Sequence, residues 1–290
     1  MPELREGRVR VEDAVVFGNA GGRALCCDLF HPPEAAGESG TDRPAIVLIH
    51  GGSWSGGDRT QLRGYGIALA RRGYVCMAIE YRLTGVAKWP AQLHDAKASL
   101  RYLRTHSARL GVDPTKISVS GNSAGAHLAL LLAGTPDVPE LEGDSGHAGA
   151  GTQCAACVAF YPPTRLYGDG HSPNAYAPGL FEPNVSEAVG RQASPIEYVH
   201  KGFPATLLIH GNRDQLVPPR ASVIMYDALI TAGAAAELHL YEGMPHGFDA
   251  GRAYFRQCVD VMQLFLDRHG CQPNQRAGQT MPAGSSAGQP

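Results

Sequence analysis

The feature that most constrains this 290-residue chain is a regular alternation of short apolar runs with longer helical patterns. The runs are AIVLI from Ala45, YVCMAIE from Tyr74, KISVS from Lys116, CAACVAFY from Cys154, ATLLIH from Ala205 and ELHLY from Glu237. Strands that are apolar on both faces occur in parallel sheets covered by helices on each side. The alternation therefore predicts an α/β fold with a mostly parallel sheet and helices on both faces.

Two further strands are predicted near the N-terminus, over residues 8–17 and 22–30. The glycine-rich link GNAGG between them favours an antiparallel hairpin, which brings the expected sheet to eight strands. A helix is expected from Pro90 to Leu110, because its apolar residues recur on one face. The helix expected from Ala124 is apolar on nearly every side, which indicates that it is buried in the middle of the fold.

The domain organisation is predicted from the composition along the chain. Residues 1–270 are expected to form one domain, since α/β folds of this size often stay undivided. Residues 162–195, rich in Pro, Gly, Tyr and Asn, interrupt the alternation and are long enough to form a small lid. Residues 271–290 contain few large apolar side chains, so we expect a disordered tail.

The overall composition excludes several kinds of partner. The chain is 43% hydrophobic and 18% charged, with a net charge of −2, so it lacks the basic excess that nucleic acids and anionic membranes attract. No apolar run approaches the ~18 residues of a membrane-spanning helix, and the charged start does not resemble a secretory signal. Seven cysteines, an odd number, indicate free thiols in a reducing compartment. We therefore expect a cytoplasmic protein that binds neither nucleic acid nor membranes.

Metal and cofactor sites are not expected either. The twelve histidines are scattered, without the HxxxH or HExxH spacing of zinc sites. Cys154 and Cys157 form a CxxC, but they fall in a strand-like run, where residues three apart face opposite sides of a sheet. We interpret both cysteines as buried thiols and expect no metal and no cofactor.

A serine between two glycines stands at one predicted strand-to-helix junction, in the stretch SVSGNSAGAHLALLLAG. In a G-x-S-x-G elbow, Gly121 and Gly125 allow the neighbouring backbone and helix to approach, while the serine is held in a strained turn. The turn lifts the Ser123 hydroxyl above the sheet edge. It also places the N–H of Ala124 at the start of the helix, where partial positive charge favours an oxyanion. Ser123 is therefore a candidate nucleophile.

A serine nucleophile requires a general base, and the base requires a carboxylate that orients it. Asp214, in HGNRDQLVPP, follows one predicted strand, and His246, in YEGMPHGFDAG, follows the next. Both are therefore expected on loops at the carboxyl ends of strands, where open α/β sheets gather their functional residues. The order Ser123, Asp214, His246 predicts a catalytic triad.

Other residues compete for two of these roles. Asp249 and Glu242 are alternative carboxylates, but both lie too near His246 in the chain to arrive from a separate strand. His210 and His127 are alternative bases. The first ends a predicted strand and the second lies on the apolar helix, so we expect both to be buried.

The stretch AIVLIHGGSWSGGD supplies further backbone donors. Small residues after a strand let backbone N–H groups approach a ligand, so Gly52 and Ser53 are expected to join Ala124 in an oxyanion hole. Trp54 is expected as a wall of the substrate pocket.

These motifs together resemble an α/β-hydrolase of the esterase/lipase group, which includes the hormone-sensitive-lipase-like carboxylesterases and the bacterial feruloyl and acetyl-xylan esterase relatives. The residues that carry the resemblance are HGGSW (50–54), EYRL (80–83), WPAQLHDAKASLRYLR (89–104), GNSAGAHLA (121–129), HGNRDQLVP (210–218) and MPHGF (244–248). The resemblance covers roughly residues 10–270. It implies the α/β-hydrolase fold, with Ser123, Asp214 and His246 as the triad.

The resemblance also implies an oxyanion hole of Gly52, Ser53 and Ala124. Ser53 stands where many hormone-sensitive-lipase-like members have a third glycine. Two further residues, Arg82 and Asp95, match family positions and are expected to form an ion pair between a loop and the helix after it.

The implied function is a serine carboxylesterase, and the small lid favours small-molecule esters with short acyl chains. The HGGxW form also resembles kynurenine formamidases, so an arylformamidase, or a peptidase with the same triad, is the alternative enzyme. A non-catalytic ligand-binding homologue is the alternative of another class. The sequence is also compatible with a homodimer.

Overall fold

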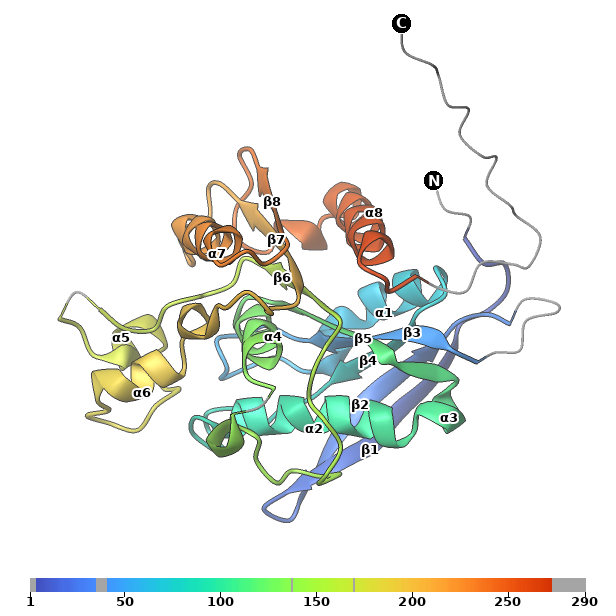
Figure 1. Cartoon of the computed structure of the whole chain (residues 1–290), viewed down its shortest axis with the longest axis horizontal. Coiled ribbons are helices and arrows are strands. Elements are labelled where there is room, and N and C mark those ends of the chain that lie inside the picture. The colour runs from blue at the N-terminus through green and yellow to red at the C-terminus, as the bar shows by residue number, and fades with distance from the viewer. Residues whose placement is uncertain (1–3, 35–40, 137, 169, 273–290) are drawn as a thin grey trace, which may run out of the picture.

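The computed structural model describes residues 4–34, 41–136, 138–168 and 170–272, and within them eight strands form a single sheet (Figure 1). The strands are β1 (Arg10–Ala20), β2 (Arg23–His31), β3 (Arg43–Ile49), β4 (Val75–Ile79), β5 (Val112–Asn122), β6 (Ala156–Phe160), β7 (Ala205–Gly211) and β8 (Ala236–Tyr241). Their order across the sheet is β1-β2-β4-β3-β5-β6-β7-β8. β1 pairs with β2 and β2 with β4 in antiparallel fashion, whereas the other neighbours are parallel. The predicted mostly parallel sheet with an N-terminal antiparallel hairpin is confirmed.

Helices connect the parallel strands. The α-helices of the described residues are α1 (Arg63–Ala70), α2 (Ala91–Thr105), α3 (Ser107–Leu110), α4 (Ala124–Gly134), α5 (Pro173–Tyr176), α6 (Glu187–Gln192), α7 (Arg220–Thr231) and α8 (Arg252–Arg268). Short 3-10 helices are η1 (Arg59–Leu62), η2 (Pro139–Leu141), η3 (Pro195–Tyr198) and η4 (Phe248–Ala250). The helix predicted from Ala124 is α4, and all of its residues are buried as expected.

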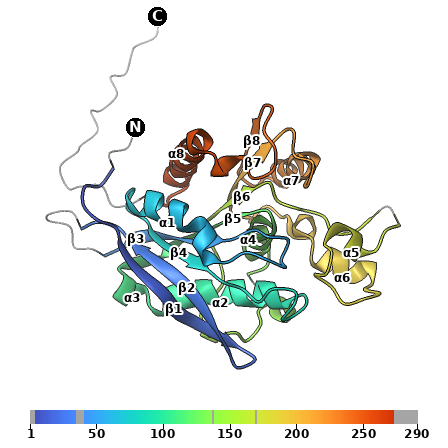
Figure 2. The same ribbon diagram turned by 180° about the vertical axis from the view of Figure 1, so that it is seen from behind.

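The side chains of β3 show how the sheet divides the interior into two apolar cores. Ala45, Val47 and Ile49 belong to the core that contains residues of α2, α4 and α7. Ile46 and Leu48 point the other way, into the core that contains residues of α1 and α8. Successive residues of a strand face opposite sides, so a strand covered on both faces is apolar throughout. Figures 1 and 2 show α1 and α2 on opposite sides of the sheet.

Two predicted elements have different bounds in the structure. β1 continues through most of the GNAGG link, and the turn is made by Gly21 and Gly22 alone, with φ of 61° and 82°. Positive φ at both central residues is what a tight hairpin turn requires. The helix expected from Pro90 to Leu110 is divided between α2 and α3, because His106 leaves the helical conformation (φ −105°, ψ 14°).

The insert expected at residues 162–195 contains α5 and α6, which lie beside the body of the fold, beyond α4 (Figure 1). It is attached to the body near α4. The indole of Trp89 donates to Gln192 Oε1 at 3.1 Å, and Nε2 of His127 donates to the carbonyl of Ala193 at 2.7 Å. These contacts hold the end of the insert against α4 and against the residue that precedes Pro90.

At the C-terminus, the expected tail of residues 271–290 falls mostly outside the described residues, which end at residue 272. Cys271 is buried, and its N–H donates to the Leu266 carbonyl at 3.0 Å, so the packed region extends at least to this residue. None of the helices in the described ranges is long and apolar enough to cross a membrane.

Candidate active site

Ser123 lies at a sharp turn between β5 and α4, as expected. Its backbone has φ 54° and ψ −117°, a strained conformation for a residue other than glycine, and its N–H donates to the Phe160 carbonyl at 2.9 Å. A Cβ on Gly121 would lie 2.4 Å from the backbone of Gly125, and a Cβ on Gly125 would lie 2.0 Å from the Ile49 carbonyl oxygen. Glycine is therefore required at position 121 for the turn to close on α4, and at position 125 for α4 to pack against β3.

His246 and Asp214 meet on two adjacent loops, after β8 and β7 respectively. Nδ1 of His246 lies 2.6 Å from Oδ2 of Asp214. Oδ1 of Asp214 accepts from the N–H groups of Leu216 and Val217, at 2.8 and 2.9 Å. Since the carboxylate accepts from Nδ1–H, the imidazole presents Nε2 as its remaining proton acceptor.

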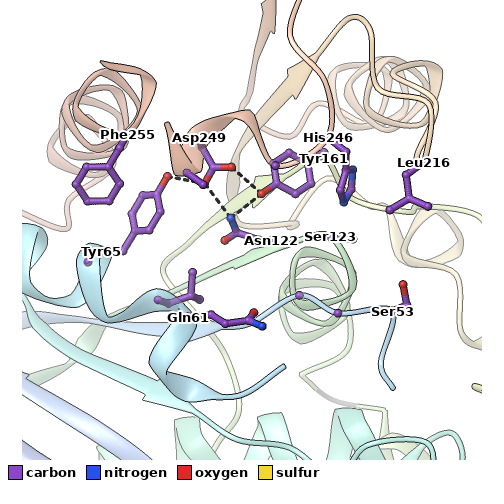
Figure 3. A pocket seen from close by; sticks show the side chains of 16 residues that line it. Ser53, Gln61, Tyr65, Asn122, Ser123, Tyr161, Leu216, His246, Asp249 and Phe255 are labelled. Carbon is purple, nitrogen blue, oxygen red and sulfur yellow. Dashed lines mark hydrogen bonds between the residues drawn. The ribbon is translucent and has the colours of Figure 1, made fainter. Parts of the chain in front are cut away.

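Ser123 and His246 both line one cavity of about 520 Å³ (Figure 3). Its described lining residues are Gly51, Gly52, Ser53, Gln61, Leu62, Gly64, Tyr65, Asn122, Ser123, Tyr161, Leu216, His246, Gly247, Asp249, Ala250 and Phe255. The fold thus brings the Ser123 hydroxyl and the His246 imidazole to one concave site. Among the described residues, these two side chains do not form a hydrogen bond with each other. No described residue of the insert 162–195 lines this cavity.

The loop after β3 runs directly over the elbow. Gly52 and Ser53 have φ of 115° and 51°, and a Cβ on Gly51 would lie 3.3 Å from Cβ of Ser123. Within the described part of the chain, the N–H groups of Gly52, Ser53 and Ala124 donate to no protein acceptor. A buried backbone donor is nearly always paired, so the unpaired N–H of the buried Ala124 is available to a ligand oxygen, while Gly52 and Ser53 are exposed and line the cavity.

Trp54 does not have the expected place in the site, because it is absent from the described residues that line the cavity. Its side chain is 3% exposed, and its indole donates to Nδ1 of His127 at 3.3 Å. The bond from Nε2 of His127 to Ala193 leaves Nδ1 as the acceptor, so this imidazole is neutral. Complete burial lowers the pKa of His127 to about 4. The indole therefore connects the loop after β3 to α4 in the interior.

His210, the other alternative base, is also buried as expected, but it contacts Asp214. Its Nε2 lies 3.2 Å from Oδ2 of Asp214 and 3.0 Å from the Val217 carbonyl, and its Nδ1 lies 2.7 Å from the Ser222 hydroxyl. Burial lowers the pKa of His210. It is not among the described residues that line the cavity.

A group of polar residues beside Ser123 could not be anticipated from the motifs. Asp249 accepts hydrogen bonds from Tyr65, Tyr161 and Asn122 at 2.7–3.0 Å, and all four side chains line the cavity (Figure 3). Asn122 is the first of the two variable residues of the G-x-S-x-G motif, and that position is its one signal in the sequence. Tyr65 and Asp249 are 184 residues apart, so no local pattern connects them.

Cys157 is a buried free thiol as expected, whereas Cys154, also free, is only half-buried. Cys154 precedes β6, so the alternation of strand faces does not apply to it, and it packs against the same apolar core as Cys157. Burial raises the pKa of Cys154 to about 12 and that of Cys157 well above its ordinary value. Across the described ranges, no group of three or more His, Cys, Asp or Glu residues is placed to hold a metal ion.

The expected pair of Arg82 and Asp95 forms between the loop after β4 and α2. Nε and Nη2 of Arg82 each lie 2.8 Å from a different oxygen of the Asp95 carboxylate. Asp95 is fully buried, and it also accepts from the Arg82 N–H and from the Ser145 hydroxyl, both at 2.8 Å. The carboxylate therefore holds three segments of the chain together.

Comparisons with known proteins show that this chain is similar to esterases. The BD-FAE family model matches residues 27–229. Esterase LipQ of Mycobacterium tuberculosis is 31% identical over 85% of this chain, and the probable carboxylic ester hydrolase LipM of the same organism is 32% identical over 91%. The native structure of the thermophilic esterase Est2 of Thermogutta terrifontis superposes with a TM-score of 0.80 and 29% identity, covering 93% of this chain and 95% of Est2. This chain spans 60% of the length of LipQ and 62% of that of LipM.

Proposed function

This chain belongs to the BD-FAE family and has the α/β-hydrolase fold of its esterase relatives, and from that premise we propose that it is a serine carboxylesterase for small-molecule esters with short acyl chains. The observation that carries the proposal is the pairing of His246 with Asp214 at 2.6 Å, on the rim of the cavity that Ser123 lines. A strained serine, an oriented imidazole and unpaired backbone donors in one cavity are the parts of an acyl-transfer site.

In the proposed acylation step, Nε2 of His246 takes the proton of Ser123 as the hydroxyl attacks the acyl carbon. Asp214 accepts from Nδ1–H, which keeps the imidazole in the tautomer with Nε2 free, and stabilises the imidazolium that forms. The two backbone N–H groups that Asp214 also accepts from hold its carboxylate in the orientation that this role requires.

The tetrahedral oxyanion is proposed to bind the N–H groups of Gly52, Ser53 and Ala124. Ala124 is the first residue of the buried helix α4, and the partial positive charge at the N-terminus of this helix faces the developing negative charge. Such preorganised donors stabilise a charge that is present only in the transition state, so they raise kcat.

Acylation ends when His246 protonates the leaving alcohol, and in the second half of the reaction water attacks the acyl-enzyme by the same route. The cavity is within the ~300–1,000 Å³ range of small-ligand sites, and its walls include the apolar side chains of Leu62 and Phe255. Est2 of T. terrifontis has been solved with propionate and with butyrate bound, which supports a short acyl group here.

Labelling with an organophosphate tests the proposal. Est2 has been solved phosphorylated by paraoxon, and we expect paraoxon to inactivate this protein with one adduct, on Ser123. The variant Ser123→Ala should take up no label and lose about 10⁶-fold in kcat on p-nitrophenyl acetate. A wild-type protein that neither reacts nor exceeds the variant in turnover would contradict the proposal and favour a ligand-binding homologue.

A panel of substrates tests the finer part of the proposal. The kcat/KM is expected to be highest for p-nitrophenyl acetate or butyrate and much lower for the laurate, because a 520 Å³ cavity must also hold the alcohol. Faster turnover of N-formylkynurenine than of every ester would identify an arylformamidase instead, and cleavage of peptides alone would identify a peptidase.

A further inference from the structure

Asp249 is a buried carboxylate in the wall of the cavity, and the proposed reaction does not use it. It is 2% exposed. Its Oδ2 accepts from the Tyr65 hydroxyl at 2.8 Å and from Nδ2 of Asn122 at 3.0 Å, and its Oδ1 accepts from the Tyr161 hydroxyl at 2.7 Å. These donors come from α1, from the end of β5 and from the segment after β6, so one side chain links three separate elements.

The donors and acceptors of this group are matched without ambiguity. A carboxylate only accepts, so both phenols must donate to it, and the oxygen of Tyr161 is left to accept from Nδ2 of Asn122 at 2.8 Å. Burial and the neighbouring carboxylate raise the pKa of Tyr65 and of Tyr161, which keeps both phenols protonated as donors. Among the described residues, no lysine or arginine forms an ion pair with Asp249. The buried charge is therefore satisfied by these three hydrogen bonds.

The hydrogen-bond partners of Asp249 adjoin both the imidazole and the serine that must meet in the reaction. The ring of Tyr161 lies against the imidazole of His246, with centroids 4.4 Å apart, and Asn122 directly precedes Ser123. Tyr161 has φ 40°, a strained backbone that surrounding contacts must maintain. Asp249 itself lies in η4, three residues after His246. Figure 3 shows Asp249 bridging Tyr65, Asn122 and Tyr161, with His246 beside Tyr161.

We propose that Asp249 is a positioning residue for His246: through Tyr161 and Asn122 it holds the imidazole-bearing loop and the serine elbow in one relative position. This inference rests on the proposed function, because it concerns the distance between the base and the nucleophile of that reaction. Asp214 sets the tautomer and direction of the imidazole from one side, and the Tyr161 ring limits its movement on another.

The kinetic signature of this role is a change in kcat rather than in KM. A displacement of about 1 Å between reacting groups can lower the rate about 10²-fold. Asn at position 249 keeps the size of the side chain, but its NH₂ group faces one of the three donors, so at least one bond of the group is lost. We expect Asp249→Asn to lower kcat on p-nitrophenyl acetate by about 10- to 100-fold, with KM within about twofold.

Two further variants complete the design. Tyr161→Phe keeps the ring against His246 and removes the bond to Asp249, and we expect it to lower kcat in the same way by about tenfold. Asp267→Asn is the matched control, because Asp267 accepts from the Tyr74 hydroxyl at 3.0 Å but lies on α8 and is not among the lining residues. Its kcat is expected to equal that of the wild type. The rate of paraoxon labelling of Ser123 at saturation should follow kcat in each variant.

The outcomes separate this inference from the proposed function. If the wild type is active and a folded Asp249→Asn protein has the same kcat, the positioning role alone is overturned. An equal loss of kcat in Asp267→Asn would overturn it as well. If circular dichroism shows that Asp249→Asn does not fold, Tyr161→Phe decides by the same criterion. A wild-type protein with neither turnover nor labelling would overturn the proposed function, and this inference with it.

Discussion

Nε2 of His210 lies 3.2 Å from Oδ2 of Asp214, the same oxygen that accepts from His246 at 2.6 Å. Nε2–H of His210 is fixed as a donor because the Val217 carbonyl lies 3.0 Å from the same nitrogen. The carboxylate is therefore held between two imidazoles, one facing the cavity and one in the interior. His210 thus contacts the carboxylate of the proposed triad on the side away from the cavity.

Removing the donor of His210 is expected to weaken catalysis. His210→Leu leaves Asp214 without this polar contact at 3.2 Å, and a contact no stronger than a typical hydrogen bond contributes about 0.5–1.5 kcal/mol, so we expect kcat to fall about 2- to 10-fold. His210→Gln retains an N–H donor and should recover part of that loss. The measurement is kcat on p-nitrophenyl acetate, with the melting temperature as a check on folding. Equal kcat in the wild type and in His210→Leu would show that the contact has no effect on turnover.

Gly52 is expected to be intolerant of a side chain. Its φ is 115°, and a Cβ would lie 2.2 Å from the Gly56 carbonyl oxygen, so Gly52→Ala must shift the loop that carries the proposed oxyanion donors. Loss of one such donor lowers kcat by about 10²–10³-fold, and KM should change little. Gly85→Ala is the control, since a Cβ there has open space and Gly85 is not among the lining residues. Similar kcat values for the two variants would argue against the assigned donors.

Asp95 is expected to matter for stability and not for chemistry. Asp95→Asn breaks the bidentate pair between a fully buried carboxylate and the largely buried Arg82, which should lower the free energy of unfolding by about 3–5 kcal/mol. Urea denaturation measures this, and the kcat of the folded fraction should be unchanged. The control is Glu187→Gln, which breaks an exposed pair with Arg191 and should cost less than about 1 kcal/mol. An unchanged stability together with a loss of turnover in Asp95→Asn would show that the pair serves the reaction instead.

His127 should make the protein less stable in mild acid. Burial lowers its pKa in the folded state from 6.5 to about 4. Below pH 6.5 the unfolded chain therefore binds a proton that the folded chain does not, so the free energy of unfolding falls until the pH reaches about 4. The full effect of this one residue is roughly 3 kcal/mol.

A comparison of His127→Gln with the wild type isolates this contribution from that of the other histidines. Urea denaturation at pH 7 and at pH 4.5 should show a smaller loss of stability on acidification in the variant. Parallel losses in the two proteins would mean that His127 does not remain neutral in the fold.

The sequence alone determined the parts of this protein that depend on local geometry. The run AIVLI predicts a strand covered on both faces, because every second residue points to the same side, and β3 does divide its side chains between two cores. The glycines beside Ser123 predict a tight elbow, because a Cβ at either position would collide with backbone. The order of Asp214 and His246 after successive strands predicts that they meet, because parallel neighbouring strands end at one edge.

Only the tertiary structure decided which other side chains surround these residues. Trp54 follows the loop over Ser123, yet its indole turns into the interior to reach His127. Asp249 is three residues from His246, but its partners lie on α1, β5 and the segment after β6. Strand faces and turns follow from periodicity and backbone sterics, which are properties of neighbouring residues. Contacts between side chains 80 or more residues apart, such as those from Asp249 to Tyr161 and Tyr65, depend on how whole elements pack, and no local pattern records them.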